Sequence, residues 1–350
     1  MTTPLPTAAA AADDLSKPPD RRRRRLLGLA AAAAALAVLV LLSLALGSKP
    51  LPIGEVAEAL WRDNGDPRII VVGQRLPRTV LAVLVGIALA VAGALMQGLT
   101  RNPLADPGLL GVSAGAALGV VLAVWLMPAA GPLLQVWAAF AGAVVTACAV
   151  FLIGSLGGRG RSPVTLVLAG VALGAVLQGL ASTVVLLNAN VFLTMRSWQA
   201  GSVADLGWRA VLTVAPFLAA GLLLAAFAAR GLNAVALGED LANALGANQW
   251  LTRIAVVAAV TLLCGSATAA IGVVWFLGMM VPHVARWITG PDQRWILAYS
   301  CLLGPSLMIA ADVLGRVVVI PDEIPAGVVT AVIGAPVLIW MVRRRNASGL

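Results

Sequence analysis

Apolar residues occur along this chain in long unbroken blocks, and polar residues occupy the shorter stretches between them. Ten blocks, rich in Ala, Leu and Val, cover residues 26–46, 79–99, 109–127, 133–156, 164–187, 210–229, 250–271, 273–287, 295–314 and 325–342. Because about 20 apolar residues suffice for a helix to cross a bilayer, each block predicts one membrane helix. Membrane β-barrels are excluded, since their strands alternate in segments of about 10 residues. The predicted fold class is an all-α polytopic membrane protein of about ten transmembrane helices.

The narrowest boundary is Gly272, which alone separates the seventh block from the eighth. Arginine clusters at 21–25 and 343–345 flank the whole set of blocks. Basic residues near span ends stay on the cytoplasmic side, so both clusters should be cytoplasmic and the number of crossings even. Ten crossings satisfy this condition, and nine do not.

Three regions follow from this pattern. Residues 1–25 predict a disordered cytoplasmic N-terminal tail, 26–342 a ten-helix transmembrane domain, and 343–350 a cytoplasmic C-terminal tail. Arginines followed by an apolar block also occur in secretory and twin-arginine signals. The first block is too long for a signal core and more blocks follow, so it predicts a signal anchor with its N-terminus inside.

Composition agrees with a membrane protein. The 350 residues are 60% hydrophobic and 11% charged, against about 45–50% and about 25% in soluble domains. The net charge of +9 could suggest nucleic acid, but the basic residues gather at block ends. With ten crossings, sixteen Lys and Arg lie inside and eight outside. The charge therefore reports topology, and no nucleic-acid partner is predicted.

Several kinds of chemistry are missing. The two lysines, Lys17 and Lys49, each precede proline, so no Walker A loop can form. Three cysteines at wide spacing and the single His283 make no metal set. A G-x-S-x-G match around Ser113 lacks a placed histidine and acid. We therefore expect no catalytic residues, no metal site and no cofactor in this chain, which is not predicted to be an enzyme.

Ion-coupled carriers usually keep an ionisable residue near the bilayer midplane. The central parts of the ten blocks hold no Asp or Glu. Asp312 lies near the outer end of the ninth block with Arg316 four residues later, where the two can pair.

A polar break at 230–249 is too long for a turn. Its apolar residues at helical spacing are Leu237, Leu241, Ala244 and Leu245. Glu239 and Asp240 favour a helix start, and Gly246 can end the helix. The break predicts a short amphipathic cytoplasmic helix. Its apolar face lacks Lys or Arg for lipid headgroups, which favours a protein partner over the lipid surface.

The outer basic residues are Lys49, Arg62, Arg68, Arg75, Arg78, Arg196, Arg209 and Arg316, and five of them precede the second block. Two interpretations of Arg75 and Arg78, which bracket Leu76-Pro77, remain open. They could anchor the helix at the headgroups, or they could bind carboxylates of an acidic docking partner. A second short amphipathic stretch, 53–61, lies on the same side.

A short internal echo relates residues 93–99 (GALMQGL) to 174–180 (GAVLQGL). Small residues allow helices to approach closely, so the echo predicts packing sites. Gln97 and Gln178 would then be buried amides that need partners.

A set of ordered motifs now points to a family. They are RLPRT at 75–79, GALMQ at 93–97, RNPLADPGLLG at 101–111, AGVAL at 169–173, ALGE at 236–239, FLG at 276–278, VPH at 281–283, Ala311-Asp312 with Arg316, GVVT at 327–330 and GAP at 334–336. In these motifs, and over nearly the whole length after the tail, the chain resembles the membrane permeases of ATP-binding-cassette importers for iron-siderophores, haem and vitamin B12.

The resemblance implies a fold like that of the vitamin B12 permease, in the bacterial cytoplasmic (inner) membrane. It implies a pore shared with a second permease subunit, identical or paralogous. Further implied partners are two ATPase subunits, which bind ATP and Mg, and an external solute-binding lipoprotein or periplasmic protein. The coupling element for the ATPases would be Leu237, Gly238, Glu239, Leu241, Ala244, Leu245 and Gly246. The docking arginines would be Arg75, Arg78 and Arg316.

The substrate is less closely defined by the resemblance. Residues 160–165 read GRSPVT, which departs from the hydroxyl-bearing gate of the vitamin B12 permease in this region. This departure argues against vitamin B12 and an unchanged gate. An iron-siderophore is expected because it is the frequent substrate in the family, with haem or vitamin B12 as the alternatives. From a different class, an ion-coupled secondary transporter remains the competing interpretation.

Overall fold

The computed structural model describes residues 21–63, 65–129, 131–156, 163–236, 238–244, 246 and 248–343, and every regular element among them is helical. The elements are α2 (Arg21–Ala45), α3 (Ile53–Trp61), α4 (Asp66–Arg68), the π-helix η1 (Ile69–Arg75), α5 (Leu76–Thr100), the 3₁₀ turn η2 (Pro107–Leu110), α6 (Val112–Leu126), α7 (Pro132–Leu156), α8 (Pro163–Leu187), α9 (Ala189–Gln199), α10 (Gly207–Ala236), α11 (Glu239–Ala244), α12 (Gln249–Ile271), α13 (Leu277–Thr289), α14 (Gln293–Val318) and α15 (Ala326–Arg343). Most of the predicted tails, residues 160–162, Leu237 and Leu245 lie outside the described residues.

The all-helical prediction is confirmed, and the count of ten is approximate. Seven helices of the described chain are long and apolar enough to cross a membrane. They are α2, the continuous rod from α4 to α5, α7, α8, α10, α12 and α14. The other three predicted blocks correspond to the shorter helices α6, α13 and α15. We call the end of the bundle with Arg75 the outer end and the end with Arg101 the inner end, following the predicted topology.

The eighth block differs most from the prediction. Helix α13 has 13 residues, about 20 Å, which is too short for a hydrocarbon core of about 30 Å. The break before it extends from Gly272 to Phe276, rather than lying at Gly272 alone, and both of these residues have positive φ. A Cβ on Gly272 would lie 1.8 Å from the Trp198 carbonyl oxygen. Gly272 is buried, and residues 273–276 line a cavity, which is where non-helical backbone is tolerated within a membrane protein.

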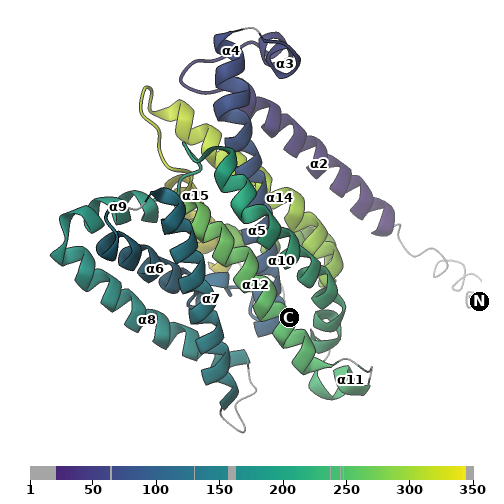
Figure 1. Ribbon diagram of the computed structural model, residues 1–350. Helices are drawn as coiled ribbons and strands as arrows, with labels where there is room; N and C mark the ends of the chain where they lie inside the picture. Colours follow the sequence, from purple (N-terminus) through teal and green to yellow (C-terminus); the bar gives the residue numbers. More distant parts are fainter. Residues whose placement is uncertain are drawn as a thin grey trace, which may run out of the picture.

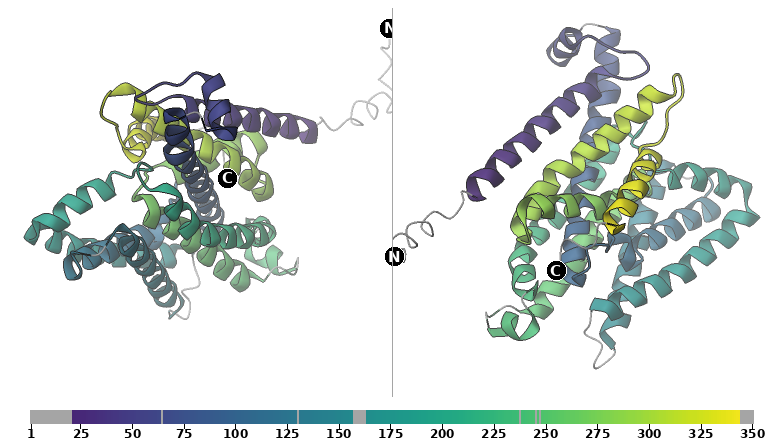
Figure 2. Two further views of the ribbon diagram at one scale, coloured as in Figure 1. Left: turned by 45° about the horizontal axis from the view of Figure 1, so that its top comes forward. Right: turned by 180° about the vertical axis from the view of Figure 1, so that it is seen from behind.

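Helix α5 forms the centre of the bundle, with α14, α10, α12 and α13 around it (Figures 1 and 2). It approaches two neighbours through glycines. A Cβ on Gly86 would lie 2.5 Å from Pro305 Cα, and one on Gly93 would lie 1.6 Å from the Gly278 carbonyl oxygen. The prediction that the repeated segment marks a close helix packing site is therefore confirmed for residues 93–99.

The two glutamines of the echo have different surroundings. Gln97 is buried, donates to the Met279 carbonyl at 2.9 Å and accepts from Arg286 at 3.1 Å. Gln178 is exposed on α8, so the expectation of a second buried amide is wrong for the isolated chain. The same local sequence lies on a central helix in one case and on an outward face in the other.

Helix α2 lies at the edge of the bundle, along α14 (Figure 1). Polar contacts hold its inner end. The hydroxyl of Tyr299 donates to the Arg25 carbonyl at 2.7 Å, and the Arg25 guanidinium lies 5.5 Å from the centre of the Trp295 ring. Between its ends, α2 packs on the core through Leu36, Leu39 and Val40, while the rest of its surface is mostly exposed.

The rod from Asp66 to Thr100 is 35 residues long, about 52 Å at 1.5 Å per residue. It therefore exceeds the hydrocarbon core by about 20 Å. Helix α3 packs on the projecting outer part, where its Val56 and Ala59 form an apolar cluster with Val71 of η1 (Figure 1). Arg75 and Arg78 lie where this projection meets α5.

Candidate functional site

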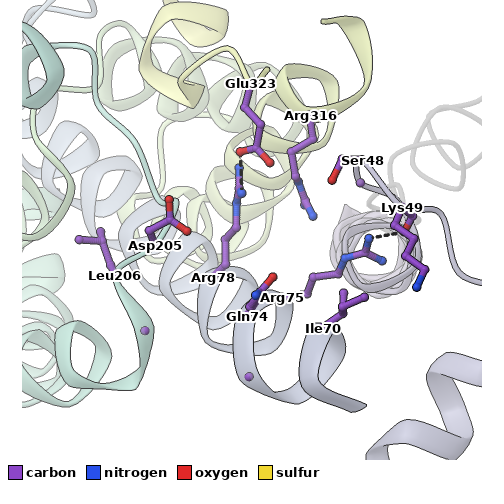
Figure 3. Close-up of a pocket in the computed structure, with 13 residues that line it drawn as sticks. Ser48, Lys49, Ile70, Gln74, Arg75, Arg78, Asp205, Leu206, Arg316 and Glu323 are labelled. Atoms are coloured by element: carbon purple, nitrogen blue, oxygen red, sulfur yellow. Dashed lines mark hydrogen bonds and ion pairs between the residues drawn. The ribbon is translucent and has the colours of Figure 1, made fainter. Parts of the chain in front are cut away.

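The outer end carries a compact cluster of charges, drawn in part in Figure 3. Arg78 binds Asp312 through Nε at 3.0 Å and Nη2 at 2.7 Å, and its Nη1 lies 2.7 Å from Glu323. Arg316 binds the same Asp312 at 2.9 Å, which confirms the predicted pairing. We call Arg75, Arg78, Asp312, Arg316 and Glu323 the outer charge cluster. It joins α5 to α14 and to the loop before α15.

Two of these arginines also hold the outer end of α2. Arg75 donates from Nη1 to the carbonyls of Leu44 at 2.8 Å and Ala45 at 2.9 Å. Arg316 donates to the carbonyl of Ser43 at 3.0 Å. The last carbonyls of a helix lack partners within the helix, and cations there are favourable. Arg75 and Arg316 are 6% and 3% exposed, so their guanidinium groups are bound within the subunit.

Neither open interpretation of the outer arginines anticipated this arrangement. The acceptors on α2 lie 30 and 31 residues from Arg75 and 273 residues from Arg316 along the chain, so no local pattern reveals them. Arg78 is the member of the three with a partly open side chain. All three arginines line a polar outer cavity of about 450 Å³, together with Lys49, Asp205 and Glu323 (Figure 3).

A second cavity, of about 760 Å³, lies at membrane depth. Its wall includes Leu89, which is eleven residues, about 16 Å, above the inner end of α5. The lining is mainly apolar, with aromatic rings, hydroxyls and amides. Its larger or polar side chains include Ser113, Gln178, Trp198, Gln199, Thr268, Trp275 and Phe276.

The cavity also contains a carboxylate that we did not anticipate. Arg101 ends α5 with a φ of 50°, and the chain then folds back so that Asp106 reaches the cavity. The Asp106 carboxylate accepts from the Gly108 amide at 2.8 Å and caps η2. Pro103, Pro107 and Gly108 are the sequence signal for this irregular segment. A mainly apolar wall with few fixed charges suits passage of an organic complex without tight coordination.

The inner polar break forms the short helix that the sequence predicts. Helix α11 begins at Glu239, as expected, because Gly238 has a φ of 112°. Leu241 is 51% exposed, whereas the neighbouring Ala242 is fully buried. Ala244 is exposed, and Gly246 follows with a φ of 73°. Helix α11 therefore packs on the bundle through Ala242 and leaves Leu241 and Ala244 exposed at the inner end.

Among the described residues, no group of three His, Cys, Asp or Glu side chains could hold a metal ion. The arrangement instead consists of an outer charge cluster, a membrane cavity and an inner exposed helix.

Comparison with known proteins shows to which family the chain belongs. The model of the FecCD transport family matches residues 35–344. The chain is 49% identical over 311 residues to the ferric enterobactin transport system permease protein FepD of Escherichia coli K12, covering 88% of this chain and 92% of FepD. It is 36% identical over 315 residues to the hemin transport system permease protein HmuU of Yersinia pestis, covering 88% and 94%.

A solved structure supports the same assignment. An inward-facing metal-chelate type ABC transporter matches with a TM-score of 0.77 and 27% identity, covering 92% of this chain and 99% of the other. The family match covers most of the chain, and both relatives are similar over most of their own length. The chain therefore belongs to the FecCD transport family.

Proposed function

We propose that this chain is the permease subunit of an ATP-binding-cassette importer for a ferric siderophore. The observation that carries the proposal is the 49% identity with a ferric enterobactin permease over 88% of the chain. The protein would reside in the bacterial inner membrane with both termini in the cytoplasm. It would form the pathway without changing the substrate chemically.

ATP hydrolysis would belong to two partner ATPase subunits, because this sequence has no Walker A loop. They would bind ATP and Mg and would contact α11. The exposed Leu241 and the buried Ala242 support this docking, since one face of α11 packs on the subunit and another is free. The residues at 237–246 that the family resemblance assigns to coupling would together form the surface that contacts the ATPases.

A second permease subunit would complete the pathway. Helices α8 and α15 expose apolar side chains in the isolated chain, among them Leu168, Val176 and Val332. Gly174 and Gln178 of α8 also line the membrane cavity. A partner that covers α8 would therefore enclose this cavity between the two subunits. Alternating access would then open it to either side in turn.

An external substrate-binding protein would dock at the outer end. All three proposed docking arginines line the outer cavity. Arg78 has the more exposed side chain, and its carboxylate partner Glu323 is partly open, so a carboxylate of the binding protein would compete with Glu323 for Arg78. Arg75 and Arg316 would support Arg78 by fixing α2. Attraction between exposed charges weakens as salt rises. We expect Arg78→Gln to lower the affinity of the binding protein and the salt dependence of that affinity. An unchanged salt dependence in a folded variant would exclude this docking role.

The test of the function is uptake of radio-iron as ferric siderophores by cells with and without the gene. Labelled haem and vitamin B12 serve as the comparators. Gene-dependent iron uptake that persists without a proton gradient, and that stops with an inhibitor of cassette ATPases, would support the proposal. Uptake that follows the gradient while ATP persists would indicate a secondary carrier.

Haem is the second candidate substrate, because a hemin permease is similar over 88% of the chain. Residues 160–165, which correspond to the gate region of the vitamin B12 permease, do not distinguish a ferric siderophore from haem. Pro163 begins α8, and residues 160–162 lie outside the described part of the chain. Gene-dependent haem uptake without iron-siderophore uptake would keep the transport mechanism and change the substrate.

A further inference from the structure

The inner end of the bundle contains a polar brace that the transport family does not by itself explain. Asn233, near the end of α10, donates from Nδ2 to the Asp292 carboxylate at 2.8 Å. Its Oδ1 accepts from the backbone amide of Gln293 at 2.8 Å. Asp292 also caps α14 by accepting from the Arg294 amide at 3.0 Å. Two hydrogen bonds from one side chain therefore fasten α10 to the first turn of α14.

The end of α5 joins the same brace. The Arg101 guanidinium donates to the Val235 carbonyl, two residues beyond Asn233. The first turn of α14 lies directly against the end of α5, because a Cβ on Gly98 would lie 2.2 Å from the Gln293 side chain. The inner ends of α5, α10 and α14 are thus fastened together. Helix α10 ends at Ala236, and α11 begins at Glu239, three residues later.

The same two helices, α5 and α14, meet again at the outer end. Between the ends they are in close contact where Gly86 faces Gly304 and Pro305. Near the outer ends Arg78 of α5 binds Asp312 of α14. Protein interiors are close-packed and transmit strain, so a pair fastened at both ends and packed between them should move as one body.

We propose that Asn233, Asp292 and Arg101 are positioning residues that make α11 move together with α5 and α14, so that a displacement of α11 at the ATPases reaches the outer charge cluster. The inference rests on the proposed importer function, because it assumes that α11 contacts the ATPases. It adds three residues that lie outside α11. Their role is to keep ATP hydrolysis linked to movement of the outer end.

Asn233→Asp tests the brace directly. It places two carboxylates where an amide and a carboxylate now lie 2.8 Å apart, and like charges at this distance repel. The matched control is the exchange variant Asn233→Asp/Asp292→Asn. In that variant the carboxylate at 233 accepts from the Gln293 amide and from the side-chain amide at 292, so the like-charge repulsion is gone and both bonds of residue 233 form again. The bond across the pair then replaces the cap of α14, because the same Asp292 oxygen accepts from Asn233 and from the Arg294 amide.

The assay uses the assembled importer in proteoliposomes with its ATPases and binding protein. Ferric siderophore transported per ATP hydrolysed is measured beside copurification of the ATPases. We expect Asn233→Asp to keep the ATPases bound and to transport at least about fivefold less substrate per ATP, the lower range of typical coupling between sites. The exchange variant should recover most of this ratio. If Asn233→Asp does not accumulate, Asn233→Ala takes its place under the same criteria.

A merely structural brace would lower transport and hydrolysis together and leave their ratio unchanged. That result, or an exchange variant that stays uncoupled, overturns the inference. If instead the proposed function is wrong, the unmodified protein will already show no ATP-driven uptake of ferric siderophore, so the two failures are distinguishable.

Discussion

Asp312 and Glu323 bind the same arginine at the same distance but differ in burial. Each places a carboxylate oxygen 2.7 Å from a nitrogen of Arg78. The Asp312 side chain is 2% exposed and also binds the 3% exposed Arg316, whereas the Glu323 side chain is 35% exposed. The pair therefore separates the effect of burial from the effect of contact distance.

Asp312→Asn keeps the shape of the side chain and removes its charge. Arg316 then keeps a buried positive charge without its carboxylate, and breaking a buried pair in this way costs about 3–5 kcal/mol. Glu323→Gln removes an exposed partner, for which the usual contribution is about 0–1 kcal/mol. We expect the free energy of unfolding to fall several times more in Asp312→Asn.

The measurement is reversible unfolding of the purified protein in detergent by denaturant titration. Hydrogen exchange of residues 43–49 adds a local readout, because Arg316 and Arg75 hold the α2 carbonyls there. Exchange should rise in Asp312→Asn and stay unchanged in Glu323→Gln. Equal losses of stability in the two variants would refute the argument that burial decides the strength of this cluster.

Two further predictions concern α11 and the centre of the bundle. Leu241→Asp should leave the fold intact, since Leu241 is exposed in the isolated chain, but should release the ATPases because it buries an unpaired charge at their contact; unchanged copurification of the ATPases would disprove the contact. Gly93→Ala should lower the free energy of unfolding by about 1–3 kcal/mol or more, because the added Cβ meets the Gly278 carbonyl at 1.6 Å. The control Gly54→Ala, where a Cβ meets nothing within 4 Å, should stay within about 0.5 kcal/mol of the parent; similar losses in both variants would contradict the close crossing of α5 and α13.

Local patterns in the sequence predicted most elements of the fold. The ten apolar blocks reappear as helices, since a continuous apolar run can enter lipid only with its backbone bonded internally. Asp312 and Arg316 pair because residues four apart share a helix face. The start of α11 after Gly238 was predictable for the same kind of reason, because its determinants are neighbours along the chain.

Contacts between distant segments were decided only by the tertiary structure. Arg75 and Arg316 bind carbonyls of α2, which carry no side-chain signature. Asp106 enters the membrane cavity because the segment after α5 folds back. The Asn233–Asp292 brace joins residues 59 positions apart. Periodicity fixes which residues form a helix and which face is apolar, whereas the partner of each polar group depends on which helices meet, and packing of the whole chain determines that.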